Sequence, residues 1–262
     1  KLGANAIVVA VPSLALVRQT RGVWLRQEAA RGRRPAWLCV CSDESAGKPE
    51  LDEAVSYTHE LGVPCVTAPA EIAAWLKKHR RGRRIVFTTY QSGEALATGA
   101  RKARTTFDLG LMDEAHKTTG RADKVFSHLL HDRNVRIKRR LAMTATERRY
   151  HGESDEIVSM EDEEVYGDTF ELLSFKKALD AKPPILADYE VLTIAVRRSE
   201  VAHLIERRAF VTPDRGDWKD LDAETLASVV ALRRAMNRYP IRHAVSFHKS
   251  IRRAREFAEH QQ

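Results

Sequence analysis

Two adjacent carboxylates, Asp113 and Glu114, follow directly after a short apolar run, and His116 stands two residues further on. Adjacent carboxylates repel each other unless a cation lies between them or one of them is protonated, so the pair suits a bound Mg²⁺. One carboxylate could hold the hydrated metal while the other orients or deprotonates an attacking water. The plainer alternative is that Asp113 caps the following helix and Glu114 favours its first turn. The pattern indicates metal–nucleotide chemistry.

Short apolar runs supply the elements that could hold these carboxylates. Each run is followed by small polar residues, and the runs lie at residues 6–11, 85–87, 107–112 and 140–143. Such runs are typical of strands in a buried parallel sheet, whose ligand sites lie at the carboxyl ends of the strands. Amphipathic stretches alternate with them at residues 14–30, 51–61 and 71–78. This alternation predicts an α/β fold built from βαβ units.

On these residues the chain resembles the superfamily 2 helicases and translocases, specifically the DEAH-box branch related to type III restriction subunits and to bacterial helicases with helicase-associated domains. Asp113-Glu114-Ala115-His116 matches that family's Walker B motif, and Thr144-Ala145-Thr146 matches its Ser/Thr-Ala-Thr motif. Further similar segments follow the family's order, at residues 12–19, 88–92, 165–167, 187–189 and 244–250. Each motif alone is weak because short peptides recur by chance, but their order and spacing together are specific. The resemblance covers nearly the whole chain.

The resemblance implies an ATP hydrolase whose cofactors are ATP and Mg²⁺. In the family pattern Asp113 would hold Mg²⁺ through water, and Glu114 would position the water that attacks the γ-phosphate. His116 would bridge toward a second domain and sense whether nucleotide is bound. The Thr144-Ala145-Thr146 motif would link Walker B to the cleft between domains through hydroxyl hydrogen bonds. The alternative is that these threonines cap a turn, which does not exclude the linkage.

The resemblance also implies contacts to a nucleic-acid backbone, which carry little sequence information. The implied residues come from three segments: Pro12, Ser13 and Gln19; Thr88, Thr89, Tyr90 and Gln91; and Phe247, His248 and Lys249. Two of them have alternatives, because Phe247 could end an apolar core strand and Tyr90 could pack beneath its loop. We expect DNA rather than RNA as the partner, although nothing in the sequence reads a 2′-hydroxyl.

The resemblance implies a RecA-like parallel sheet flanked by helices, followed by the opening part of a second RecA-like domain. Two prolines in Lys182-Pro183-Pro184 mark the expected boundary. They give a first RecA-like ATPase domain at residues 1–183 and the start of a second at residues 184–262. Within the second, residues 188–196 and 243–247 have strand patterns, whereas residues 201–210 and 223–236 have helical patterns.

No Gly-x-x-x-x-Gly-Lys-Ser/Thr segment occurs in the sequence, although the family uses that loop to bind the β- and γ-phosphates. The arginine-rich motif that would supply an arginine finger is also absent. We therefore expect an internal fragment that lacks its N-terminal phosphate loop and hydrolyses ATP poorly by itself. On this interpretation the activity belongs to a longer parent.

Composition favours a polyanionic partner, because 44 Lys and Arg against 36 Asp and Glu give a formal net charge of +8. Bases concentrate at residues 77–84 and 233–255 and acids at residues 153–164, although such runs are more often solvated faces than binding sites. Cys39, Cys41 and Cys65 are too few for a disulfide scaffold or a four-cysteine zinc site, which favours a reduced, cytoplasmic protein. No apolar segment approaches the ~20 residues that span a membrane, so we expect no membrane partner.

The leading hypothesis is an ATP-dependent translocase or helicase acting on DNA, as the motor of a restriction or phage-defence system with that system's subunits as partners. The rival is a nucleic-acid-binding scaffold whose motor is degenerate, and an RNA helicase is a third possibility. The sequence that precedes Lys1 would separate the first two. A Gly-Lys-Ser/Thr loop within ~20 residues favours the motor, because one connecting helix needs about that length.

Overall fold

The computed structural model describes residues 3–42, 65–121, 125–148, 157–197, 199, 202, 221–248 and 250–259 of the 262-residue chain. The chain divides into two compact units, of which the first ends at Phe170 and the second begins at Glu171. This division lies earlier in the chain than the domain boundary expected at residues 183–184, which stays a prediction.

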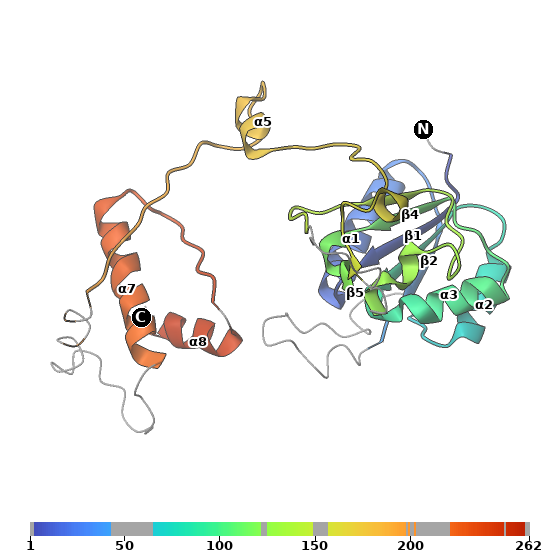
Figure 1. The fold of residues 1–262 in the computed structure, drawn as a ribbon, viewed down its shortest axis with the longest axis horizontal. Helices are drawn as coiled ribbons and strands as arrows, with labels where there is room; N and C mark the ends of the chain where they lie inside the picture. The colour runs from blue at the N-terminus through green and yellow to red at the C-terminus, as the bar shows by residue number, and fades with distance from the viewer. Residues whose placement is uncertain are drawn as a thin grey trace. The chain divides into compact units, whose positions relative to one another are not determined.

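The first unit is built on a five-stranded sheet in which every strand is parallel to its neighbours. The order across the sheet is β2-β3-β1-β4-β6. The strands are β1 (Ala6–Val11), β2 (Ala36–Val40), β3 (Arg84–Thr89), β4 (Leu109–Met112) and β6 (Arg140–Ala142). At the centre, Val8 of β1 is paired with Val86 on one side and with Gly110 on the other. The predicted α/β parallel sheet is confirmed, and the strands point the same way, so their carboxyl ends share one edge (Figure 1).

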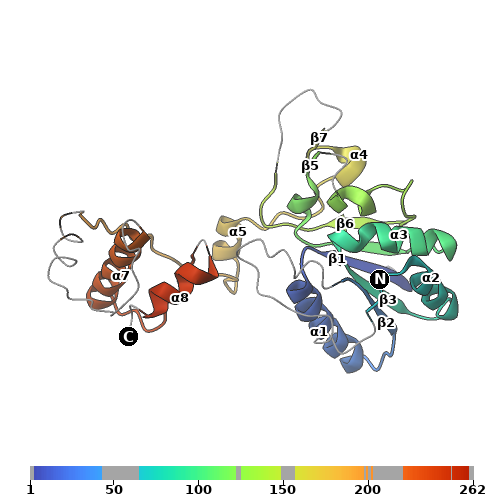
Figure 2. The same ribbon diagram turned by 90° about the horizontal axis from the view of Figure 1, so that it is seen from below.

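The strands consist of continuous apolar runs because helices cover both faces of the sheet and bury the side chains on each. All six residues of β1 are buried, as expected for a parallel sheet between two helix layers. Val8 belongs to a core shared with α2 (Pro69–Lys78) and α3 (Gly93–Lys102). Its neighbour Val9 belongs to a second core shared with α1 (Leu14–Ala30). The helices therefore lie on opposite faces, α1 on one and α2 with α3 on the other (Figure 2).

The predicted elements of the first unit that fall within the described residues are found, and the predictions omit α3 and β2. β1 and α1 begin and end at the predicted residues. The α1 helix begins after Ser13, whose Oγ accepts a hydrogen bond of 3.4 Å from the Leu16 backbone N–H, as an N-cap does. The predictions omit β2, although its apolar run directly follows Pro35. The helix predicted at residues 51–61 lies outside the described residues.

Helices α2 and α3 pack against each other at Gly99. A Cβ atom built on Gly99 would lie 2.5 Å from Ile72 Cγ2 and 3.1 Å from the Pro69 carbonyl oxygen. Real side chains do not approach so closely, so this crossing requires glycine. The contact brings together two helices whose last turns are both basic, with Lys77 and Lys78 in α2 and Arg101 and Lys102 in α3.

Shorter elements complete the first unit. The 3₁₀ helix η3 (Tyr90–Ser92) follows β3 directly, η4 (Ala115–Thr118) follows β4 after two residues, and η5 (Val125–Leu130) precedes β6. A short antiparallel pair joins β5 (Gly120–Arg121) to β7 (Ile157–Val158), and α4 (Glu163–Tyr166) follows it. The three cysteines are free thiols. Of the helices in the described part of the chain, none has both the length and the apolar character needed to cross a membrane.

In the second unit the described residues form helices and irregular segments, without a strand. The α5 helix (Phe175–Asp180) begins after Ser174, whose Oγ accepts a 3.2 Å hydrogen bond from the Lys177 N–H. The long α7 helix (Leu221–Arg238) contacts α8 (Ile251–Glu259). The helix predicted at residues 223–236 is thus confirmed, and the helix predicted at residues 201–210 falls almost entirely outside the described residues.

The strands predicted at residues 188–196 and 243–247 are wrong. A strand needs a neighbour with which it exchanges backbone hydrogen bonds, and an apolar pattern alone does not provide one. Both segments also leave apolar side chains in solvent, since Val191 is 81% exposed and Val245 is 82% exposed. Neither segment therefore packs onto a core in the described part of the second unit, whose assignment to a second RecA-like domain stays a prediction.

Candidate functional site

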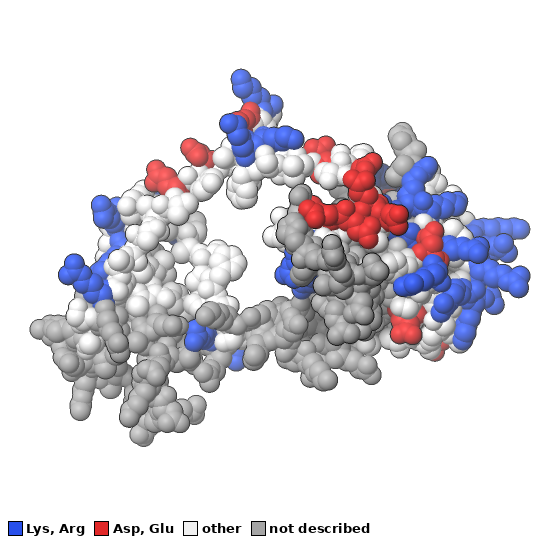
Figure 3. All heavy atoms as spheres, viewed as in Figure 1, with Lys and Arg blue, Asp and Glu red and all other residues white. Residues whose placement is uncertain are grey.

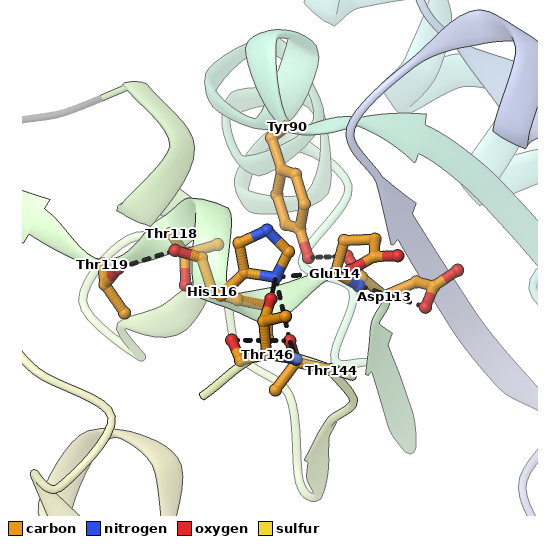
Figure 4. Close-up of polar contacts among 9 residues, drawn as sticks. Tyr90, Asp113, Glu114, His116, Thr118, Thr119, Thr144 and Thr146 are labelled. Atoms are coloured by element: carbon orange, nitrogen blue, oxygen red, sulfur yellow. Dashed lines mark hydrogen bonds and ion pairs between the residues drawn. The ribbon is translucent and has the colours of Figure 1, made fainter. Parts of the chain in front are cut away.

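Strand β4 carries Asp113 and Glu114 to the carboxyl edge of the sheet, between β1 and β6. Backbone hydrogen bonds hold the strand tip on both sides. The Asp113 N–H donates to the Ala10 carbonyl (2.9 Å), and the Met143 N–H donates to the Met112 carbonyl (2.9 Å). The Ala115 N–H then donates to the Met143 carbonyl (2.9 Å), so the turn after β4 is joined to the segment after β6. The predicted Walker B and Thr-Ala-Thr motifs therefore lie side by side (Figure 4).

Asp113 is held at its backbone and at one carboxylate oxygen. Its carbonyl accepts a 2.7 Å hydrogen bond from the Tyr90 hydroxyl, and its Oδ1 accepts a 3.1 Å bond from the Glu114 N–H. This bond comes from the next residue in the chain, whereas a capping side chain accepts from the second or third residue of the helix. Because η4 begins after Glu114 without a side-chain cap, the alternative in which Asp113 caps the helix is wrong. The second oxygen, Oδ2, has no hydrogen-bond partner among the described residues. The half-buried carboxylate thus keeps an oxygen for a further ligand.

Glu114 has a left-handed backbone conformation, with φ +51° and ψ 44°. This conformation costs a residue with a side chain about 1–2 kcal/mol. It reverses the chain direction directly after the strand and starts η4, which brings His116 back toward the strand tip. Strain of this kind is found at functional sites, where the surrounding hydrogen bonds maintain it.

His116 Nδ1 faces three oxygens: Thr144 Oγ1 at 2.8 Å, Thr146 Oγ1 at 3.2 Å and Glu114 Oε2 at 3.3 Å. Thr144 Oγ1 is also placed to donate to the Thr146 carbonyl (3.1 Å) and to accept from the Thr146 N–H (3.1 Å). Since a hydroxyl has only one hydrogen, Thr144 then accepts from the imidazole. We therefore assign the proton to Nδ1, which also avoids opposing a ring lone pair to the Glu114 carboxylate.

The donor set fits a hydrated Mg²⁺. This ion is usually bound by one or two carboxylates and completed by water and substrate phosphates. Asp113 offers such a carboxylate at the strand tip, with Glu114 next to it in sequence. Among the described residues no three or more His, Cys, Asp or Glu side chains gather into a metal-binding group. The Mg²⁺ expected here would therefore take its remaining ligands from water and phosphate.

Residues 88–91, predicted to contact nucleic acid, lie mostly inside the protein. Thr88 Oγ1 donates to the Val40 carbonyl (3.0 Å), and Thr89 Oγ1 donates to Ser92 Oγ (3.2 Å). Tyr90 is 1% exposed, and burial together with the nearby Asp113 charge raises its pKa. Tyr90 thus packs beneath the loop and supports Asp113, while Gln91 is exposed. Contact between this segment and nucleic acid stays a prediction. Gln91 is the residue of the segment whose side chain is exposed and could make that contact.

The other predicted nucleic-acid contacts lie in two places. At the start of α1, Pro12 is buried, Ser13 caps the helix and Gln19 is exposed. In the second unit Phe247 is 94% exposed, so its alternative role as a core residue is wrong for the described structure. His248 Nε2 lies 2.9 Å from Ser246 Oγ, and its ring centre lies 4.7 Å from that of Phe257. Lys249 lies outside the described residues.

Sequence reasoning missed a second layer of side chains behind His116. Thr119 Oγ1 donates to the His116 carbonyl (2.6 Å), and Thr118 Oγ1 donates to the Ala115 carbonyl (2.7 Å). Thr118 Oγ1 also lies 2.7 Å from the Tyr166 hydroxyl, whose pKa is raised by burial. Two threonines that follow the histidine after Lys117 were the available signal, because hydroxyls there can bond back to the preceding turn. Their bonds fix the turn that carries His116.

Comparison with known proteins gives one family and related structures. Residues 1–149 match the family described as "Type III restriction enzyme, res subunit". A solved structure described as "ATP-dependent Type ISP restriction-modification enzyme LlaBIII bound to DNA" has a TM-score of 0.63 and 25% identity, over 88% of this chain and 15% of that chain.

A second structure is a nuclease-deletion mutant of the Type ISP restriction-modification enzyme LlaGI in complex with a DNA substrate mimic. Its TM-score is 0.47 and its identity 24%, over 77% of this chain and 17% of that chain. The search of curated proteins found no match. The chain therefore spans less than a fifth of the length of the two restriction–modification enzymes that it resembles.

Proposed function

Because the chain belongs to the family of type III restriction enzyme res subunits, we propose that it is the ATPase part of a DNA translocase or helicase of restriction–modification type. The family match covers residues 1–149, which include the whole five-stranded sheet and both motifs at its carboxyl edge. Similarity to an enzyme described as ATP-dependent and bound to DNA supports ATP as the cofactor and DNA as the partner.

The observation that carries the proposal is the hydrogen bond of 2.8 Å between His116 and Thr144. A helix cap would need neither this contact nor the backbone bond from Ala115 to Met143. Both would serve an ATPase that performs mechanical work, because a change at the hydrolytic carboxylates must reach another part of the protein. These two bonds connect the segment after β4 directly to the segment after β6.

Asp113 and Glu114 have different roles in this proposal. Asp113 would hold Mg²⁺ through water with the carboxylate oxygen that does not bond the Glu114 N–H. Bound Mg²⁺ supplies neutralisation of the charge on the phosphate oxygens of ATP. The Glu114 carboxylate orients the attacking water and accepts its proton. The Glu114 Oε2 atom lies 3.3 Å from His116 Nδ1. A change in the hydrogen bonding of the Glu114 carboxylate therefore changes the hydrogen bonding of the His116 imidazole.

His116 passes that change to residues 144–146. The Nδ1 proton is shared among Thr144, Thr146 and Glu114, and a stronger pull from the carboxylate weakens its bond to the threonines. Ala145 and Thr146 are exposed, so the segment can touch a neighbouring domain. DNA is held by its backbone through Gln19 and Gln91 on the first unit and through residues 247–249 on the second.

The test is ATP hydrolysis by the intact protein, alone and with double-stranded DNA, single-stranded DNA or RNA. Stimulation by either DNA is expected, and the stronger of the two identifies the substrate along which the protein moves. Stimulation by RNA alone would replace the proposal by an RNA helicase. No hydrolysis under any condition would replace it by a nucleic-acid-binding scaffold with a degenerate motor.

A further inference from the structure

The connections that lead into the strands are strongly basic. Four of them, residues 31–35, 79–83, 103–108 and 131–139, enter β2, β3, β4 and β6. Together they contain eleven Lys and Arg and two Asp, a formal charge of +9, whereas the whole chain has a formal charge of +8. The positive charge of the protein is therefore concentrated in these four connections.

All four connections lie at one end of the molecule's sheet. Since the strands are parallel, their amino ends share the edge opposite to that of Asp113 and Glu114. Figure 3 shows Lys and Arg gathered over the part of the first unit that carries α2 and α3, at the right of the view. We call the Lys and Arg side chains of the four connections the basic face.

Three carboxylates near the basic face already have basic partners. Asp108 Oδ1 pairs with Lys138 (2.8 Å), while its Oδ2 accepts bonds from the Asn5 and Ala6 N–H groups (3.0 Å each). Asp132 pairs with Arg140 (2.8 Å). Glu28 pairs with Arg83 (3.2 Å) and lies 4.0 Å from Arg33. Glu163 and Glu164 line a pocket together with Arg133.

Several bases of the face have no acidic partner. The side chains of Arg34, Arg81, Arg104, Arg136 and Arg139 are exposed, and within the described residues none of them forms an ion pair. They come from all four connections. Unpaired like charges held together at one edge repel one another, and an ordinary solvated surface lowers this repulsion by mixing in acids.

Helix electrostatics explains only the neighbours of the basic face. Lysines and arginines in the last turn of a helix stabilise it by interacting with the negative end of its dipole. That accounts for Lys77 and Lys78 of α2 and for Arg101 and Lys102 of α3. The bases of the connections lie beyond the last turns of the helices, so most of their positive charge has no role in stabilising the fold.

We infer that the basic face binds the phosphate backbone of duplex DNA, as a second contact separate from the carboxyl edge. Neighbouring strands are about 4.8 Å apart, so five strands place these bases across about 19 Å. Duplex DNA presents about 11 phosphate charges over that length. The choice of DNA among polyanions rests on the proposed function, whereas the contact itself requires no ATP.

The test compares two double variants of the full chain in binding to a short fluorescent DNA duplex without nucleotide. Arg81→Gln/Arg139→Gln removes two bases of the face, and Arg26→Gln/Lys176→Gln removes two exposed bases elsewhere. Both lower the formal charge from +8 to +6. Each lost phosphate contact lowers the slope of log affinity against log salt by about 0.9, so the face variant should lose about 1.8. Its affinity at low salt should fall about tenfold or more, with the control unchanged.

A second face variant, Arg34→Gln/Arg136→Gln, removes two other arginines of the basic face and should lose the same affinity as the first. Agreement between the two variants shows that a local folding defect in one of them does not cause the loss. Equal losses in the face and control variants would overturn the inference, because total charge would then explain binding. A face variant that binds DNA normally but loses binding to anionic lipid vesicles would also overturn it. These outcomes are separate from the proposed function, which ATP hydrolysis by the intact protein decides.

Discussion

The two ends of the same sheet hold their charged side chains in different ways. At the carboxyl end, Glu114 and His116 lie in a network of hydrogen bonds that maintains a left-handed backbone. At the amino end, Arg81 and Arg139 are exposed and have no acidic partner among the described residues. Chemistry on a reacting atom needs fixed groups and tolerates strain to obtain them, whereas binding a phosphate backbone needs only a sufficient density of charge.

The largest expected effect separates the two ends by activity. Glu114→Gln keeps the shape of the side chain but removes the carboxylate that accepts the proton, so ATP hydrolysis by the intact protein should fall about 100-fold or more. Binding of nucleotide and of duplex DNA should stay at the parental level, because neither the Mg²⁺ carboxylate nor the basic face changes. Steady-state hydrolysis and fluorescence anisotropy measure the two quantities.

The matched control for that variant is Glu71→Gln, at an exposed glutamate in the first turn of α2. It changes the same functional group on a helix that carries none of the motif residues, and it should leave hydrolysis unaltered. A Glu114→Gln protein that hydrolyses ATP at the parental rate would show that the role assigned to Glu114 is wrong.

A second prediction concerns the helices that support the basic face. Gly99→Ala would place a Cβ 2.5 Å from Ile72 Cγ2, and relieving that overlap should lower the free energy of unfolding by about 1–3 kcal/mol. Gly22→Ala in α1 is the control, since its nearest contact would be Arg26 Nη1 at an ordinary 3.7 Å. Alanine should raise stability there by up to about 1 kcal/mol. Urea unfolding of both variants tests this, and equal stability of Gly99→Ala and wild type would refute the tight α2–α3 contact.

A third prediction addresses the connection from the hydrolytic turn to residues 144–146. Thr144→Val removes the hydroxyl that accepts the His116 proton, and one such bond contributes about 1–1.5 kcal/mol. Stimulation of ATP hydrolysis by DNA should therefore drop about tenfold, with nucleotide binding unchanged. Thr144→Ser should restore it, and Thr67→Val, at an exposed position, serves as the control. Undiminished stimulation in Thr144→Val would mean that the bond has no part in coupling.

The smallest expected effect lies at the amino end and depends on pH. Hydrogen bonds from the Ala6 N–H, then from Lys138, lower the pKa of Asp108 from its ordinary value to about 2. The ionised carboxylate therefore stabilises the folded state fully above about pH 4, and this contribution is lost as the pH falls toward 2. Asp108→Asn should reduce the pH dependence of the urea midpoint in that range while changing hydrolysis little. An unchanged pH dependence would remove Asp108 as its source.

The sequence predicted the carboxyl edge better than the second unit, for physical reasons. Buried strands of a parallel sheet are short apolar runs, so β1 could be placed to the residue and the carboxylates after β4 could be assigned to a strand tip. The same apolar pattern gave a wrong strand prediction at residues 188–196. The pattern of apolar residues does not indicate whether a neighbouring strand is present to form hydrogen bonds. The link between His116 and Thr144, 28 residues apart, followed only from the family resemblance.

By itself, the sequence determined which residue types reach the site and four of the five strands of the parallel sheet, because both follow from the local order of apolar and polar side chains. Only the tertiary structure decided the strand order, the burial of Thr88 and Tyr90, and the support that Tyr166 gives to the turn through Thr118. It also decided that four separate basic connections share one edge. These features depend on hydrogen bonds and packing between residues far apart in the chain, which no local pattern specifies.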